Sequence, residues 1–113
     1  MVGHLVHLEL ERAGLPASLS ATMLDGFLRT GLGFDGVLVS DDMAMRAISS
    51  EYGFEDSVRL ALGAGVDLYV HSNSGPYQAD FVDTYHSAVR AALADGTLSQ
   101  ASLEASAARL ANW

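Results

Sequence analysis

The sequence predicts a parallel α/β fold, and two observations carry that prediction. First, three short apolar segments, residues 1–6, 36–40 and 66–70, lack the polar alternation of a half-exposed strand, which is typical of strands covered on both faces. Second, segments with helical spacing of apolar residues alternate with them along the chain. Strands that alternate with helices favour a parallel sheet joined by right-handed crossovers.

Four helices are expected between and after these strands. The first spans about residues 21–30, with Ser20 as its N-cap, and the second spans about residues 55–62. A long third helix is expected over about residues 77–94, and Ser99 caps the last one. The predicted inward faces consist of Val58, Ala61 and Leu62 on the second helix and Phe81, Val82, Tyr85, Val89, Ala92 and Leu93 on the third.

Length and composition fit one globular domain over residues 1–113. Half of the residues are apolar and 18% are charged, which is enough apolar material for a core. The formal net charge of −8 disfavours binding to nucleic acid or to anionic lipid, because both need a basic surface. No apolar run approaches the roughly 20 residues of a membrane span, and the opening residues lack the features of a signal peptide.

A glycine pattern at residues 31–36 matches G-x-G-x-x-G, the fingerprint of dinucleotide-binding folds. In such folds the glycines follow a strand and open a helix, so that the helix N-terminus meets the pyrophosphate. Here the glycines follow a predicted helix and precede a predicted strand. We therefore expect a helix C-cap and a tight turn at this position, and we disfavour a nucleotide site.

Two consecutive carboxylates, Asp41 and Asp42, close the second predicted strand. Catalytic groups of parallel α/β folds gather at the carboxyl ends of the strands. Successive strand residues point to opposite sides, so at most one of the two side chains faces the interior, and the other serves the loop or the next helix. Spacing alone leaves open whether either is catalytic or both are solvated loop carboxylates.

The histidines and serines add little from spacing alone. His4 lies near the end of the first predicted strand, where it lines a pocket or, more commonly, is a hydrogen-bonded structural residue. No carboxylate–histidine cluster has metal-ligand spacing, so we expect no metal and no cofactor. There is no cysteine, and Ser40 is not part of a G-x-S-x-G nucleophile elbow.

The segment from residue 32 to 48, Leu-Gly-Phe-Asp-Gly-Val-Leu-Val-Ser-Asp-Asp-Met-Ala-Met-Arg-Ala-Ile, resembles the nucleophile region of glycoside hydrolase family 3. It is most similar to the bacterial β-N-acetylhexosaminidase branch, which uses Ser-Asp-Asp, an apolar residue and then Met. Residues 1–4, 16–20 and 61–68 extend the resemblance, so that it covers nearly the whole chain.

The resemblance implies a fold, a reaction and site residues. The chain would form the last three βα units of a (β/α)8 TIM-like barrel plus a C-terminal helix. Asp41 would be the nucleophile of a retaining reaction on terminal β-N-acetylglucosaminides, peptidoglycan-derived and cytoplasmic in this branch. We also expect His4 and Met45 near the mouth of the pocket as substrate-binding residues, although core packing is the alternative for Met45.

Parts of the family's active site have no counterpart in these residues. Its acid/base histidine with a paired aspartate, its Lys-His pair and its sugar-binding arginine lie on earlier strands, and this chain contains no lysine. We therefore expect an incomplete barrel with little activity of its own and with exposed edges that favour association. The alternatives are a non-catalytic α/β binding or scaffold module and a phosphate- or nucleotide-binding domain.

Overall fold

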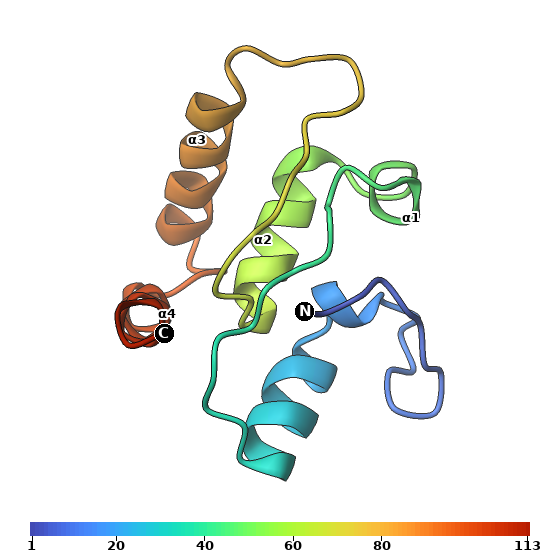
Figure 1. Ribbon diagram of the computed structural model, residues 1–113, viewed down its shortest axis with the longest axis vertical. Coiled ribbons are helices and arrows are strands. Elements are labelled where there is room, and N and C mark those ends of the chain that lie inside the picture. The colour runs from blue at the N-terminus through green and yellow to red at the C-terminus, as the bar shows by residue number, and fades with distance from the viewer.

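Six helices follow one another in the computed structural model, which describes residues 1–113 (Figure 1). None of them combines the length and the apolar composition that a membrane crossing requires. In chain order they are the 3₁₀ turn η1 (Ala17–Leu19), the π-type helix η2 (Thr22–Gly31), the short α1 (Arg46–Ser49), α2 (Phe54–Ala64), α3 (Phe81–Ala94) and α4 (Gln100–Ala111).

The three predicted strands lie side by side, but they do not form regular strands. Val2 pairs in parallel with Ser40, and Val39 pairs in parallel with Leu68, each as an isolated bridge. The middle segment therefore lies between the other two, and Figure 1 shows its green ribbon running near the yellow third segment in front of α2. The prediction of strands was wrong in extent, because each pair of neighbouring segments is joined by a single bridge, which is too little to form a continuous ladder.

Helix α2 is the central element of the core. Its predicted inward face is confirmed, since Val58 and Ala61 are fully buried and Leu62 is 8% exposed. Two apolar clusters meet on this helix, one with the extended segments and one with α3. The first comprises Leu19, Leu24, Leu38, Met43, Ile48, Ala61, Ala64 and Val66, and the second comprises Val58, Leu62, Ala88, Ala92 and Leu98.

Helix α3 begins four residues later than the sequence predicts. The preceding loop is closed on itself, because the Asn73 side chain accepts a hydrogen bond from the Gln78 N–H (3.1 Å) and donates one to the Gln78 carbonyl (3.0 Å). Asn73 also has a left-handed backbone, at φ 51°, which ends the extended segment. The predicted stripe is wrong at Val82, which is 60% exposed, because the first turn of α3 is packed through Phe81 on Phe54 and His71, and Val82 points in another direction.

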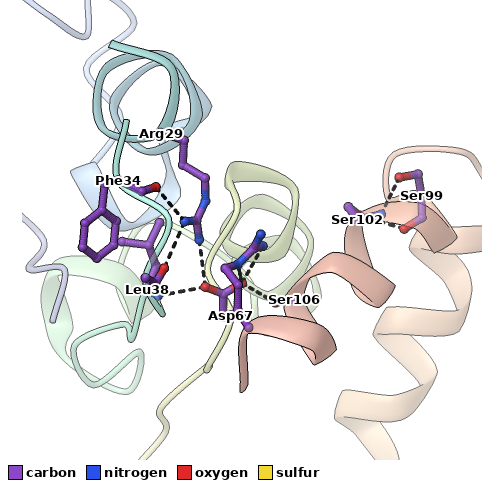
Figure 2. A network of polar contacts seen from close by, with 9 residues as sticks. Arg29, Phe34, Leu38, Asp67, Ser99, Ser102 and Ser106 are labelled. Atoms are coloured by element: carbon purple, nitrogen blue, oxygen red, sulfur yellow. Dashed lines mark hydrogen bonds and ion pairs between the residues drawn. The ribbon is translucent and has the colours of Figure 1, made fainter. Parts of the chain in front are cut away.

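Helix α4 contains no buried residue and contacts the rest of the fold through Leu103, which packs on the second cluster, and through one buried carboxylate (Figure 2). Ser99 caps it as predicted, by accepting a hydrogen bond from the Ser102 N–H at 3.1 Å. The Asp67 side chain, fully buried at the start of the third segment, accepts hydrogen bonds from Ser106 (2.5 Å) and from Arg109 (2.8 and 3.0 Å). We call this group of contacts the Asp67 hub.

The Asp67 hub also fixes the conformation of the glycine-rich turn, because Arg29 connects the two. Arg29 of η2 binds the second carboxylate oxygen of Asp67 at 2.8 Å and donates to the carbonyls of Phe34 (3.1 Å) and Gly36 (3.0 Å). Gly33 has a left-handed φ of 68°, so the turn after η2 is confirmed as a glycine-dependent connection. Because the turn directs carbonyl oxygens at an arginine, these atoms are not arranged to bind an anion.

Candidate active site

The backbone of the carboxylate pair is fixed by the parallel segments. The Asp41 N–H donates to the Val2 carbonyl at 2.8 Å, and the N–H of the neighbouring Ser40 donates to the Leu68 carbonyl at 3.0 Å. The Ser40 side chain is fully buried and accepts a hydrogen bond from the Val70 N–H at 2.9 Å. The carboxylate pair therefore comes directly after the middle segment, residues 36–40, which has a parallel neighbour on each side.

The two carboxylates have different partners. One oxygen of Asp42 accepts hydrogen bonds from the Ala44 N–H (3.0 Å) and the Ser72 N–H (2.9 Å), so this side chain joins the two loops that follow the middle and third segments. Asp41, which is half-buried, accepts only from the N–H of Asp42, at 2.7 Å. Asp42 thus serves the two loops, whereas the nucleophile role of Asp41 stays a prediction.

The Asp42 carboxylate is held in its ionised form. Burial acts to raise its pKa, but the hydrogen bonds from Ser72 and Ala44 and the nearby His71 ring outweigh burial and leave the pKa below its ordinary value. Asp42 is therefore a charged acceptor at neutral pH, and it has no proton to donate.

His4 contacts the backbone of the carboxylate pair. Its Nε2 lies 3.0 Å from the Asp42 carbonyl, and its Nδ1 lies 2.6 Å from Ser18 Oγ. A carbonyl can only accept, so Nε2 carries a proton, and in the neutral ring Nδ1 accepts from the serine hydroxyl. Both ring nitrogens are thus occupied within the protein, and the contact fixes the position of the Asp42 backbone.

Met45 lies at the start of α1, and its side chain is 45% exposed. Its N–H donates to the Asp42 carbonyl at 3.0 Å, the same oxygen that His4 contacts. The backbone of Asp42 therefore brings His4 and Met45 together. Their roles as substrate-binding residues remain predictions.

His71 is a candidate that the sequence reasoning passed over. It directly follows the third segment, so its position after a strand was the signal that could have found it. Its Nδ1 accepts a hydrogen bond from the Asn73 N–H at 3.1 Å, which leaves the proton of the neutral ring on Nε2. Burial among aromatic rings lowers the pKa of His71 against the opposing effect of the Asp42 carboxylate, so the ring is neutral at pH 7.

The structure is mostly helical and places a pair of carboxylates at the carboxyl end of the middle of three parallel segments, the end at which barrel enzymes gather their catalytic groups. No group of three or more His, Asp and Glu side chains is placed to hold a metal ion. Residues 1–113 match the family described as "Glycosyl hydrolase family 3 N terminal domain". The chain belongs to this family.

Individual relatives cover most of this chain but are much longer. A β-hexosaminidase of Thioalkalivibrio sulfidiphilus is 38% identical over 78 residues, which are 68% of this chain and 22% of that protein. A family 3 β-N-acetylglucosaminidase structure from a Paenibacillus species is 34% identical, with a TM-score of 0.82 over 93% of this chain and 19% of that one.

The β-N-acetylglucosaminidase structure of Thermotoga maritima is 31% identical, with a TM-score of 0.76 over 88% of this chain and 21% of that one. These likenesses confirm the expected relationship to family 3 β-hexosaminidases and to part of their TIM-like domain. The chain spans about a fifth of the length of the curated relatives that it matches.

Proposed function

We propose that this chain supplies the nucleophile segment of a retaining β-N-acetylhexosaminidase acting on terminal β-N-acetylglucosaminides. The observation that supports this most directly is the difference in hydrogen bonding: one Asp42 oxygen joins two loops, whereas Asp41 accepts only from the neighbouring Asp42 N–H. The names of the relatives support the substrate class. In this proposal the chain corresponds to the last three βα units and the C-terminal helix of a (β/α)8 barrel.

The proposed reaction is a double displacement. A carboxylate oxygen of Asp41 attacks the anomeric carbon, a C–O bond to the enzyme forms, and the bond to the leaving oxygen breaks as that oxygen receives a proton. Water then gives a proton to the group that protonated the leaving oxygen, attacks the same carbon, releases Asp41 as a carboxylate and leaves the sugar with its original configuration. The N–H of Asp42 donates a 2.7 Å hydrogen bond to one oxygen of Asp41 and so fixes the orientation of the carboxylate.

The acid that protonates the leaving oxygen is expected to come from outside these residues. His4 has both ring nitrogens occupied, and Asp42 is held ionised by its loop contacts. Loss of positioned acid catalysis costs on the order of 10²–10⁴-fold in rate. The proposal therefore includes further barrel units, either in the same polypeptide or in a partner that covers the open edges of the parallel segments. It also includes peptidoglycan-derived substrates in the cytoplasm as the natural substrates.

A chimeric barrel tests the proposed function. The matching 78-residue region of the Thioalkalivibrio β-hexosaminidase would be replaced by the corresponding region of this chain. We expect turnover of an aryl N-acetyl-β-glucosaminide that Asp41→Asn abolishes, while Asp42→Asn retains a measurable first-turnover burst. Full turnover in the Asp41→Asn chimera, or loss of the burst only in Asp42→Asn, would show that the wrong carboxylate has been assigned.

A further inference from the structure

A cavity of about 320 Å³ lies at the opposite end of the parallel segments from Asp41. Its walls come from η2, from the end of α2 with the turn that follows it, and from α4. The third segment begins beside the cavity at Val66, whereas Asp41 follows the end of the middle segment, and the two segments run in parallel. The cavity is therefore separate from the candidate active site, and what it binds is independent of the role of Asp41.

Two arginines of the lining keep N–H groups without a partner in the chain. Arg29 uses both of its Nη atoms in the Asp67 hub and the glycine-rich turn, but its Nε–H donates to nothing (Figure 2). Arg109 binds Asp67 through Nε and Nη2, which leaves both N–H groups of Nη1. Guanidinium N–H groups of this kind suit a carboxylate, to which they donate charge-assisted hydrogen bonds.

Acceptors without a partner belong to the same lining. Helix α2 ends at Ala64, and the next four N–H groups along the chain bond to the carbonyls of residues 38, 61 and 62. The carbonyls of Gly63 and Ala64, two residues of the lining, are therefore left without a hydrogen bond. Asp25, which is exposed in the first turn of η2, has neither an ion pair nor a side-chain hydrogen bond. A helix C-terminus and a carboxylate both favour a positively charged group.

The charges around the cavity balance, and part of its lining is apolar. Asp67, which both arginines bind, and Asp25 offset the two guanidinium charges. A ligand that carries both a positive and a negative group therefore gains more here than one with a net charge of either sign. Leu62, Val66 and Leu103 supply the apolar part of the lining. The volume lies at the lower end of the range for small-molecule sites.

We propose that this cavity binds a free amino acid with an apolar side chain of about the size of leucine. Its carboxylate accepts from the unused N–H groups of Arg29 and Arg109, and its ammonium group donates to Asp25 and to the last carbonyls of α2. Its side chain packs on the leucine and valine side chains of the lining. The bound amino acid links η2, α2 and α4, and it stabilises the docking of α4, a helix that contains no buried residue.

Titration of the ¹⁵N-labelled chain with leucine and two analogues tests the proposal. Isocaproate is leucine without the ammonium group, and isoamylamine is leucine without the carboxylate. We expect leucine to bind with a Kd in the millimolar range and each analogue to bind about tenfold more weakly, because each loses one charge-assisted contact. Leucine should shift the amide NMR signals of residues 62–66 and 102–109, and it should raise the Tm by a few degrees.

Two Asp→Asn substitutions provide the matched comparison. Asp25→Asn removes the carboxylate of the cavity and should weaken leucine binding by about threefold, with isocaproate unaffected. Asp83→Asn makes the same change at an exposed aspartate in the first turn of α3, which does not line the cavity, and it should change neither affinity. Neither side chain makes a hydrogen bond or ion pair in the chain, so both variants should fold. The arginines hold the Asp67 hub, so the contact with the ligand carboxylate is tested through isoamylamine rather than through an arginine variant.

Each other outcome overturns the proposal in a different way. Equal affinities for leucine and isocaproate would show that no group receives the ammonium, and equal affinities for leucine and isoamylamine would show that the arginines do not bind the carboxylate. An equal loss of leucine affinity in Asp25→Asn and Asp83→Asn would reveal an effect of overall charge and not of the cavity. Shifts confined to other residues, or no saturable shift with leucine, would show that the cavity does not bind an amino acid.

Discussion

Removing the charge of the Asp67 hub should destabilise the fold more than any other single carboxylate change. The carboxylate is fully buried and accepts five hydrogen bonds, of which Leu38 N–H (2.8 Å) and Arg29 (2.8 Å) share one oxygen. Asp67→Asn keeps one acceptor oxygen but turns an amide NH₂ toward the donors on the other side. Ser106 and Arg109, or else Arg29 and Leu38, then lose their acceptor.

The expected cost is about 3 kcal/mol in the free energy of unfolding. Breaking a buried ion pair by removing one partner costs about 3–5 kcal/mol, and the lower end applies because both arginine side chains retain some solvent contact. For a domain of this size the loss corresponds to a fall in Tm of roughly 10–20 °C. Urea unfolding followed by circular dichroism would measure it.

A matched control makes the same chemical change at an exposed ion pair. Asp56 pairs with Arg59 at 2.5 Å on the surface of α2, where both side chains are more than 40% exposed. Asp56→Asn should therefore cost less than about 1 kcal/mol. If Asp67→Asn and Asp56→Asn differed by less than about 0.5 kcal/mol, the Asp67 hub would not hold α4 and η2 in the way described.

The pH dependence of stability provides a second check on the Asp67 hub. Burial acts to raise the pKa of Asp67, but the hydrogen bonds from Arg109, Leu38 and Ser106 outweigh it and leave the pKa below its ordinary value. A carboxyl whose folded-state pKa is depressed stabilises the fold above its unfolded-state pKa, about 3.9, and this stability is lost as the pH falls through the folded-state value. The wild-type protein should therefore lose more stability below about pH 4 than Asp67→Asn does.

Three further outcomes follow from the structure. Gly65→Ala should lower the free energy of unfolding by about 1–2 kcal/mol, because Gly65 has a left-handed φ of 101° that a Cβ disfavours even in open space. Gly3 also lies in open space but has no left-handed φ, so Gly3→Ala should cost much less. Equal losses of stability for the two variants in thermal unfolding would refute this. NMR titration should give His71 a pKa below that of a free histidine, and Asp42→Asn should lower it further, because the carboxylate raises it; an upward shift would contradict the assignment. The purified chain should hydrolyse an aryl N-acetyl-β-glucosaminide little or not at all, and robust turnover lost in Asp41→Asn would show that a proton donor lies within these residues.

Local signals in the sequence predicted the four longer helices but neither η1 nor α1. Ser99, the apolar spacing on α2 and the left-handed glycines act within one or two turns, so they are visible in the sequence without knowledge of the fold. The start of α3 escaped prediction because the side chain of Asn73 closes a loop with the backbone of Gln78. Such a contact can compete with helix formation, but nothing in the apolar spacing reveals it.

Contacts between distant residues could not be predicted from spacing. Asp67 binds partners 29 to 42 positions away, and its only sequence signal is a carboxylate at the start of an apolar segment. The strands were overestimated because their extent depends on neighbours, not on composition alone. At the site, strand alternation predicted that Asp41 and Asp42 differ, whereas the contact of Asp42 with Ser72 required the two loops to be placed in space.

The most direct test of the central claim is to identify the residue that becomes glycosylated. The chimeric barrel would be quenched during turnover of an activated N-acetyl-β-glucosaminide and examined by intact-mass and peptide mass spectrometry. We predict a mass increase of one N-acetylhexosamine unit on the peptide that contains Asp41, fragmentation that places it on Asp41, and its absence in Asp41→Asn. An adduct on Asp42, or full turnover by the Asp41→Asn protein, would contradict the assignment of Asp41 as the nucleophile.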